Sequence, residues 1–492
     1  MGKTAVSAIV MSVLAVVSVM AWAQSKELPQ YIHRPILLHV GEEGLEHGHF
    51  VFSEGAATPA PIAPNLGAAN YVPFLSTSTA ASAGAEVDIS NSSSSEYRGE
   101  TGAASNGVLI VGGSNHIFPG ACATQNCAVA AYASTDGTTW ARTVLSKTWS
   151  GTTFGITFDP AIDYDKSGNF YYVFGGAPLS GNYPNSIAVS KSTNGTSWAA
   201  PVAVTLNTRK SFDDKYWIAV DRSDTAYANR LYVTWDRNSA NNQTLYLSYS
   251  SNGGSTWRAP IKVNDGTSAF ERVIGAYVAV DHSTGTVYDS WLDYARNKIF
   301  VDKSTNGGAS WGVDVTAATT HTGFGTDLGC VGGRSQGPAH HLKVGPSGAL
   351  YLVYADNVTG RGYDILFTKS VNNGATWSVP VTLNDDGGAA HQFHPTLSVT
   401  SNGLGGDKVA VTFYDRRDDS ANCLSHVYGT VSIDNGTIWT ANVKLTAAPS
   451  NFDGNPNGPG DYSSSAFMGS SAWPFFSDHR ATIFEIYTAP IQ

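Results

Sequence analysis

Charged residues are scarce in this chain, and no basic excess exists among those it has. Only 14% of the 492 residues are Asp, Glu, Lys or Arg, and the formal net charge is -10. Nucleic acids and anionic lipid surfaces are bound through basic stripes or polybasic segments, and the sequence contains neither. We therefore expect neither nucleic acid nor a membrane surface as a partner.

Long apolar runs are also missing, with one exception at the start of the chain. Lys3 precedes an apolar run from Ala5 to Met20, which is followed by Ala21-Trp22-Ala23. This order of a positive residue, an apolar run and a small-x-small site is typical of a secretory signal peptide. The run is shorter than the roughly 20 residues of a membrane-spanning helix. We therefore prefer a signal peptide at 1–23 to a membrane anchor, and expect a secreted or periplasmic protein.

Cysteine is rare as well, with four residues in the chain. Export would allow them to form disulfides, and four cysteines permit three pairings. Of these we favour Cys122 with Cys127 and Cys330 with Cys423.

Glycine and aromatic residues are abundant, which suits short packed strands joined by tight turns. One phrase of seven or eight residues, Ser-x-Asp/Asn followed by Gly and then Trp, occurs six times. We call it the tryptophan phrase, and its copies are Ser134–Trp140, Ser192–Trp198, Ser250–Trp257, Ser304–Trp311, Ser370–Trp377 and Ser432–Trp439. Successive copies are 54 to 66 residues apart, which is the length of one four-stranded antiparallel sheet with its turns.

The repeat therefore predicts an all-β protein, a single β-propeller over residues 85–492. Seven units can be placed, with six blades as the alternative. The second strand of each unit is expected at 108–111, 170–174, 231–235, 287–291, 350–354, 409–414 and 472–476. The last unit lacks a fourth strand, which residues 85–90 can supply and so close the ring. Residues 24–84 do not fit the repeat and are interpreted as an extended N-terminal arm.

The phrase itself is predicted to be structural. Its third residue is Asp in two copies and Asn in four, an exchange that acid-base chemistry does not tolerate. An Asx turn does tolerate it, because either side chain accepts hydrogen bonds from backbone N–H groups two or three residues further on. We expect all six phrases on the turns between the third and fourth strands.

The phrase resembles the Asp-box, or bacterial neuraminidase repeat, with the pattern Ser-x-Asp-x-Gly-x-x-Trp. The resemblance covers residues 134–439, and the first two copies are one residue shorter between the Asx position and Gly. It identifies the chain as similar to the sialidase superfamily, whose members include sialidases, other glycosidases, polysaccharide lyases and binding proteins. A sialidase-like glycoside hydrolase acting on a glycan or polysaccharide is the favoured implication.

Candidate site residues gather on the face opposite the phrases. In five units the second strand ends in an aromatic residue, then Asp, with Arg nearby. The first strands begin with further polar residues, which include Asp159, the Asp213-Asp214-Lys215 run, His340-His341, His394 and Asp461-Tyr462. In the first two units Gly112-Gly113 and Gly175-Gly176 replace the aromatic-Asp pair, and we expect a depression there.

The sialidase resemblance implies roles for some of these residues. Three arginines, Arg237, Arg417 and Arg480, would clamp a substrate carboxylate. Tyr462 with Glu271 would form the nucleophile pair, and Asp159 or Asp214 would be the acid. Two further arginines complete the candidate set: Arg98, in a Tyr-Arg pair that keeps two residues of the family's aromatic-Arg-Ile-Pro motif, and Arg296 of the fourth unit.

Three alternatives stay open. The Asp/Arg pattern also suits inter-blade salt bridges and turn caps without catalysis. A binding propeller would use the same polar groups without turnover, and a lyase would use His340, His341, His394 or Tyr462 as a base. No cofactor or catalytic metal is expected, although the run from Asp453 to Asp461 is compatible with a structural calcium loop.

Overall fold

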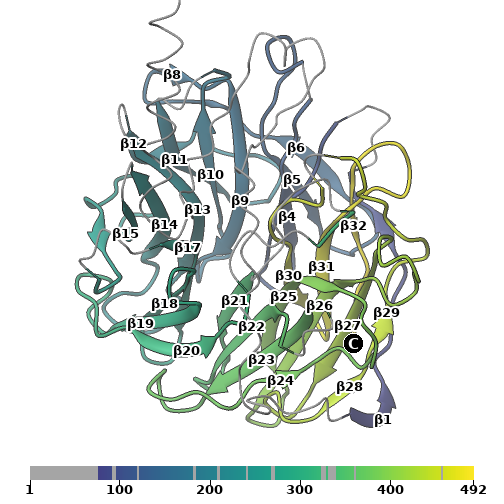
Figure 1. Ribbon diagram of the computed structural model, residues 1–492. Coiled ribbons are helices and arrows are strands. Elements are labelled where there is room, and N and C mark those ends of the chain that lie inside the picture. Colours follow the sequence, from purple (N-terminus) through teal and green to yellow (C-terminus); the bar gives the residue numbers. More distant parts are fainter. Residues whose placement is uncertain are drawn as a thin grey trace, which may run out of the picture.

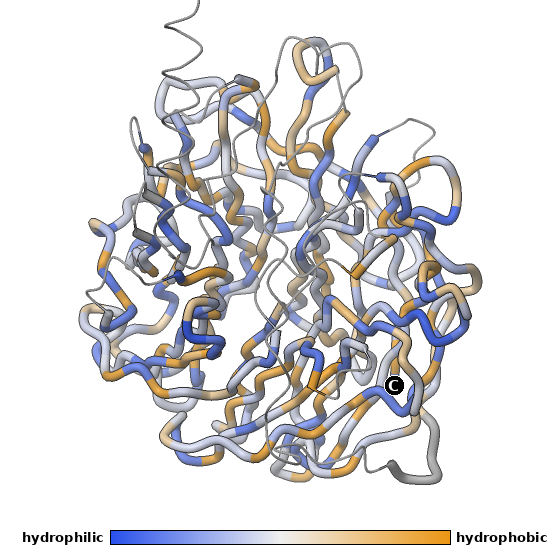
Figure 2. Tube along the Cα trace, in the orientation of Figure 1, coloured by the Kyte–Doolittle hydropathy of each residue, from blue (hydrophilic) through white to orange (hydrophobic). Residues whose placement is uncertain are grey.

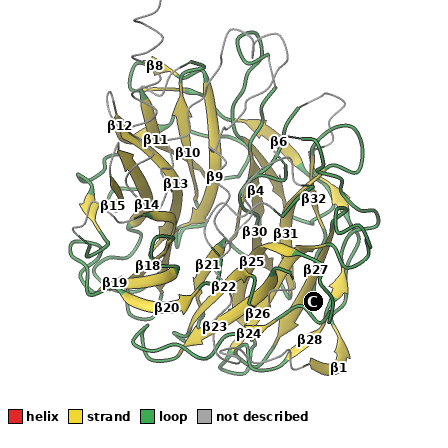
Figure 3. Ribbon diagram, viewed as in Figure 1, coloured by secondary structure: helices red, strands yellow, loops and turns green. Residues whose placement is uncertain are grey.

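The structure is a computed structural model that describes residues 76–90, 96–118, 121–180, 184–207, 211–239, 242–266, 272–322, 328–330, 339–358, 362–455 and 458–492. Within these ranges the secondary structure consists of strands joined by loops and turns (Figure 3). The predicted signal peptide and residues 24–75 of the predicted arm lie outside the described residues.

The strands form seven four-stranded antiparallel sheets, which we number as blades 1 to 7 in chain order. Blade 1 contains β3 (Thr101–Ser105), β4 (Ile110–Ser114), β5 (Ala130–Ser134) and β6 (Ala141–Val144). Blade 2 contains β9 (Ile156–Tyr164), β10 (Phe170–Ala177), β11 (Asn185–Ser192) and β12 (Val202–Asn207). Blade 3 contains β13 (Ser211–Val220), β14 (Leu231–Ser239), β15 (Asn242–Ser250) and β16 (Ile261–Lys262). Blades 4 and 5 contain β17 (Val273–Asp281), β18 (Thr286–Asp293), β19 (Lys298–Ser304) and β20 (Val315–Thr319), then β21 (His340–Val344), β22 (Leu350–Asp356), β23 (Asp364–Ser370) and β24 (Val381–Thr382).

Blade 6 contains β25 (Gln392–Ser401), β26 (Asp407–Asp415), β27 (His426–Ser432) and β29 (Val443–Lys444). Blade 7 contains β30 (Ser464–Met468), β31 (Ser471–Asp478) and β32 (Glu485–Thr488), and its fourth strand is β2 (Val87–Asp88), from the other end of the chain. Two small pairings lie outside the blades: β7 (Thr148–Trp149) with β8 (Thr152–Thr153), and β1 (Ser76–Ala80) in parallel with β28 (Trp439–Ala441).

The blades close into a ring. Each first strand packs against the first strand of the next blade, from β3 through β9, β13, β17, β21 and β25 to β30, and β30 packs against β3. The last blade therefore lies beside the first, as the yellow and blue strands in Figure 1 show. The sequence prediction of a seven-bladed all-β propeller is confirmed.

The core lies between the faces of neighbouring blades, so both faces of each inner strand are covered. This explains why second strands such as β10, β22 and β31 are buried along their whole length. Trp235 and Trp291 are fully buried and stack on Tyr246 and Phe300 of their own blades. Apolar and polar stretches consequently alternate around the whole ring, as Figure 2 shows.

All six tryptophan phrases lie on the turns that leave the third strand of blades 1 to 6. In each copy the Asx side chain accepts a hydrogen bond from a backbone N–H three or four residues later, as in Asp434 Oδ1 with Ile438 N at 2.9 Å and Asn194 Oδ1 with Ser197 N at 2.8 Å. The serine hydroxyl accepts from the glycine N–H, at 2.8 Å in the first copy. The predicted Asx turn is therefore present with either Asp or Asn.

We expect Asp434→Asn to change the free energy of unfolding by less than about 0.5 kcal/mol, because the amide oxygen keeps both backbone hydrogen bonds. Asp434→Ala should lower the free energy of unfolding by about 1 kcal/mol. Denaturant titration of both variants measures the difference. A larger loss for Asn than for Ala would contradict a purely structural role, and Asn372→Asp is the reverse control.

Both predicted disulfides are present, Cys122–Cys127 and Cys330–Cys423. The second joins the connection between blades 4 and 5 to the loop after β26. The buried guanidinium of Arg416 supports it by donating to the backbone oxygens of Leu328, Gly329 and Asn422, at 2.7 to 2.9 Å. Two distant loops are thus fixed against each other on the face opposite the phrases.

Candidate functional site

The starts of the first strands bring unusual backbone conformations together at the axis of the ring. Four non-glycine residues there have backbone φ angles between 44° and 56°. They are Glu100, Asp159, Lys215 and His394, from blades 1, 2, 3 and 6 respectively. A non-glycine residue in this left-handed region costs of order 1–3 kcal/mol, and such residues concentrate at functional sites. Strand pairing is interrupted at the same positions in blades 3 and 6.

A pocket of about 50 Å³ lies beside these residues, lined from blades 3, 4, 5 and 7. We call it the axial pocket. Its lining combines apolar and aromatic side chains with an ammonium group and a carboxylate, and the main contributors are Lys215, Trp217, Tyr277, His340, Asp461 and Tyr462. The Trp217 ring packs edge to face with Tyr462, at 5.9 Å between centroids, and in a tilted arrangement with Tyr277, at 4.6 Å.

Lys215 is the ionic centre of the pocket. Its Nζ contacts Oδ2 of Asp461 and lies 3.6 Å from Oδ2 of Asp159, so it joins three blades. Burial lowers the pKa of Lys215, but the carboxyl groups of Asp159, Asp214, Asp461 and Glu100 outweigh burial and raise it well above its ordinary value. The ammonium group is therefore permanently charged.

Asp159 has the opposite tendency. It is buried, and burial raises its pKa well above the ordinary value; Glu100 and Asp214 raise it further, and Lys215 lowers it. Its backbone N–H donates to Oδ1 of Asn115 at 2.8 Å, and Asn115 in turn donates to Glu100. Asp159 is thus a carboxyl group whose protonated form is favoured, and its Oδ2 lies 3.6 Å from the ammonium group that Asp461 pairs with.

Two polar atoms in the lining have no protein partner among the described residues. The Trp217 indole N–H and the Tyr277 hydroxyl make no hydrogen bond there, although their side chains are only 6% and 7% exposed. Neither atom is fully enclosed, so each touches the space of the pocket. Buried polar groups are almost always hydrogen-bonded, and these two are therefore available to a ligand.

Of the four predicted catalytic residues, Tyr462 lines the pocket, and Asp159 and Asp214 contact Lys215, another residue of its lining. Glu271, the predicted partner of Tyr462, lies outside the described residues. Burial raises the pKa of Tyr462 well above its ordinary value, and Asp159 and Glu100 raise it further. A tyrosine nucleophile needs the reverse, a lowered pKa, so this environment favours a phenol that keeps its proton.

The five predicted substrate-binding arginines are all engaged in ion pairs. Each pairs with a carboxylate of its own blade: Arg98–Glu96, Arg237–Asp213, Arg296–Asp293, Arg417–Asp415 and Arg480–Asp478. Arg237 binds Asp213 through two nitrogens, at 2.6 and 2.9 Å. The described arrangement matches the alternative reading of the Asp/Arg pattern as ion pairs and turn caps.

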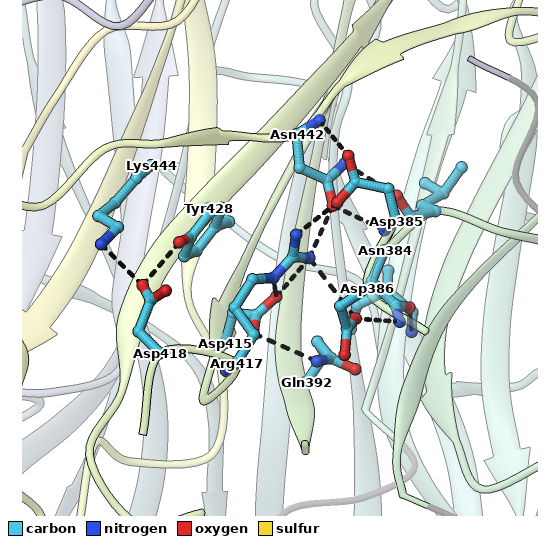
Figure 4. Close-up of polar contacts among 12 residues, drawn as sticks. Asn384, Asp385, Asp386, Gln392, Asp415, Arg417, Asp418, Tyr428, Asn442 and Lys444 are labelled. Carbon is cyan, nitrogen blue, oxygen red and sulfur yellow. Dashed lines mark hydrogen bonds and ion pairs between the residues drawn. The ribbon is translucent and has the colours of Figure 1, made fainter. Parts of the chain in front are cut away.

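Figure 4 shows how one of these arginines ties two blades together. Arg417 also contacts Asp385 of blade 5 and donates to Oδ1 of Asn442 in blade 6 at 2.8 Å. Asp385 and Asn442 bind each other reciprocally, each accepting the other's backbone N–H at 2.9 or 3.0 Å. Asn442 lies between β28 and β29.

Blades 3 and 4 are joined by an equivalent contact between two acids, Asp265 and Asp314. Each carboxylate accepts a hydrogen bond from the backbone N–H of the other residue. Burial raises the pKa of Asp314 to about 7; Asp265 and Asp302 raise it too, and Arg296 lowers it. The folded-state pKa of Asp314 exceeds the unfolded value of about 3.9. Its contribution to the free energy of unfolding is therefore fully present below about pH 4 and is lost as the pH rises through about 7.

Between pH 5 and 8 we expect the free energy of unfolding of the parent protein to fall by roughly 1–2 kcal/mol because Asp314 ionises. Asp314→Asn should not show this fall. Urea unfolding at several pH values measures it. Asn442→Asp is the matched control, in which the Arg417 guanidinium should prevent any such loss. Identical pH slopes for the parent protein and Asp314→Asn would rule out this origin.

The predicted depression over blades 1 and 2 is not formed by their glycines. A side chain at Gly112 would collide with the Phe475 ring, and one at Gly175 with the Tyr216 hydroxyl. These glycines make room for neighbouring aromatic rings, and the pocket lies on the other side of the axis.

Metal and membrane signals are weak within the described ranges. The single cluster of three potential metal ligands found there is Cys330, Cys423 and Asp453, and its two sulfurs form a disulfide. A structural calcium ion in the 453–461 loop stays a prediction. No helix that could cross a membrane was found among the described residues.

Sequence reasoning placed the start of the first strands correctly but missed the roles of Lys215, Trp217 and Tyr277. A signal for Lys215 was present, because a lysine directly after two aspartates at this position is unlike the other blades. No sequence signal marks Tyr277, which lies in an otherwise apolar strand start.

Comparisons with known proteins support the architecture. No protein-family model and no curated protein sequence matches the chain. A PL25 ulvan lyase is 10% identical over 82% of this chain and 95% of its own, with a TM-score of 0.50. A Hadza microbial sialidase is 16% identical over 74% of this chain and 73% of its own, with a TM-score of 0.45. An α-L-arabinanase from Penicillium chrysogenum is 11% identical over 73% of this chain and 99% of its own, with a TM-score of 0.46. At 10% identity the similarity to the lyase shows the fold alone.

Proposed function

We propose that the axial pocket binds a glycan and hydrolyses a glycosidic bond. Glycoside hydrolysis uses two carboxyl groups with different protonation states, an acid for the leaving oxygen and a carboxylate as base or nucleophile. The observation that supports this role is the Asp159–Lys215–Asp461 arrangement, a buried acid and a lysine-paired carboxylate flanking one ammonium group. Asp159 is assigned as the acid and Asp461 as the second carboxylate.

The remaining lining suits a sugar. Aromatic rings pack against the C–H faces of sugars, and the partnerless Trp217 N–H and Tyr277 hydroxyl can bond to sugar hydroxyls. Asp214, whose Oδ1 accepts the Lys215 N–H at 3.0 Å, positions the lysine backbone. Tyr462 then contributes its ring and hydroxyl to binding rather than a nucleophile.

A polysaccharide lyase is the second candidate, and one observation favours it. His340 lines the pocket as an unprotonated imidazole, although burial, which lowers its pKa to about 3, also makes it a weak base. A lyase also needs a cation to neutralise the uronate of its substrate. Lys215, the cation of the pocket, is already paired with Asp461, so hydrolysis ranks first.

Turnover of a panel of fluorogenic sialosides, arabinosides and other glycosides, together with uronate polysaccharides, tests the proposal. Release of the fluorophore supports hydrolysis, and an unsaturated uronate product identifies a lyase. Binding without turnover of any member would instead identify a recognition propeller. The two disulfides agree with secretion to an oxidising compartment, and cell fractionation with thiol labelling tests that part.

A further inference from the structure

We propose that the axial pocket selects a positively charged sugar, an amino sugar with a free ammonium group, over a neutral or acidic one. This inference rests on the proposed glycan binding and concerns which substrates the same pocket accepts.

The charge balance of the pocket is the first argument. Five carboxyl groups interact electrostatically with Lys215 or with one another. They are Glu100, Asp159, Asp214, Asp236 and Asp461. Four are buried, and Asp461 is half-buried in the lining. Lys215 is the one cation in the described lining, and Asp461 is the carboxylate beside it. Because burial favours the protonated forms of Asp159 and Asp236, at most three of the five carboxyl groups carry a negative charge, two more than the one ammonium group.

The lack of an available cation is the second argument. An acidic sugar needs a cationic partner in the site, which here would have to be Lys215 or an arginine. Lys215 is engaged by Asp461 and Asp159. Arg237 of blade 3 is held by both oxygens of Asp213. Neither of these two described cations is therefore a free counter-charge for a sugar carboxylate.

The aromatic lining is the third argument. Trp217, Tyr277 and Tyr462 come from three different blades and turn their rings toward one another around the pocket. Ring faces attract ammonium groups, by about 0.5–1 kcal/mol at exposed sites and more where water is excluded. The Tyr277 hydroxyl is also free to accept a hydrogen bond from an ammonium group.

Binding of a cation should also change protonation in the pocket. Burial keeps Asp159 and Asp236 in the acid form, with Asp214 raising the pKa of both. An added positive charge favours their ionised forms, so an ammonium ligand should release protons and a neutral ligand should not.

Calorimetric titration of the full-length protein with three β-1,4-linked gluco-oligosaccharides of equal length tests the inference. They differ in one substituent of each ring: a glucosamine oligomer carries an ammonium group at C2, a glucose oligomer is neutral, and a glucuronate oligomer carries a carboxylate at C6. We expect the amino oligomer to bind at least about tenfold more tightly than the glucose oligomer, and the glucuronate oligomer most weakly. Buffers of different ionisation enthalpy should reveal proton release with the amino oligomer alone, and high salt should reduce its advantage.

Two variants separate the pocket from the overall charge. Asp461→Asn should remove most of the preference. Asp224→Asn makes the same charge change on the exposed turn at the far end of blade 3, beside Lys166, and should leave the preference unchanged. Equal or tighter binding of the neutral or acidic oligomer, or no binding of the amino oligomer, would overturn the inference. Hydrolysis of a neutral glycan with no amine preference would reject the inference alone, whereas amine-selective binding without turnover would reject hydrolysis alone.

Discussion

Replacement of Asp159 by Asn should lower kcat by about 10²–10⁴-fold on the best substrate of the panel, because an amide cannot protonate the leaving oxygen. Burial raises the pKa of the parent carboxyl group, so the parent activity should extend to neutral pH and fall at alkaline pH as Asp159 ionises. The variant should lose that alkaline limb. Initial rates between pH 4 and 9 measure both effects.

Folding should survive this change. Asp159 is a buried acid with a raised pKa, and an uncharged amide of the same size removes the energetic cost of ionising it. The thermal midpoint of Asp159→Asn should therefore equal or exceed that of the parent protein. Asp214→Asn is the matched control at the other candidate acid. Loss of activity in Asp214→Asn with full activity in Asp159→Asn would move the acid role to Asp214.

The parts of the molecule that could be predicted from sequence are those built by local interactions. Each tryptophan phrase closes a turn through hydrogen bonds that span two to four residues, so its pattern is visible in the sequence. The Asp/Arg pairs at the ends of the second strands are also local, as in Asp478 with Arg480 or Asp293 with Arg296. The sequence left open whether these residues form ion pairs or a shared clamp.

The axial pocket depends on contacts that the sequence does not reveal. Lys215 and Asp461 are 246 residues apart and meet because the ring closes. The sequence suggested that the starts of the first strands converge, which placed Asp159, Asp214 and Tyr462 in the candidate site. It gave no sign of which carboxyl group would pair with the ammonium group and which would keep its proton, since burial and neighbouring charge decide both.

Removal of the Lys215 ammonium group should have the largest effect on stability. Lys215→Met leaves the Asp461 carboxylate beside Asp159 and Glu100 without its counter-charge, and loss of one partner of a buried ion pair costs about 3–5 kcal/mol. Without the ammonium group the folded-state pKa of Asp461 should rise. The loss should then be smaller at pH 5 than at pH 8, because protonation removes the uncompensated charge.

The double variant Lys215→Met/Asp461→Asn distinguishes a charge effect from a packing effect. If the lost ion pair is responsible, the second substitution should restore much of the stability, because no unpaired carboxylate is left at position 461. Denaturant titration of both single variants and the double variant gives the coupling free energy. Strictly additive losses would show that Lys215 supports the fold through its hydrocarbon chain rather than through its charge, and the role of the ammonium group in separating the two carboxyl groups would then fail.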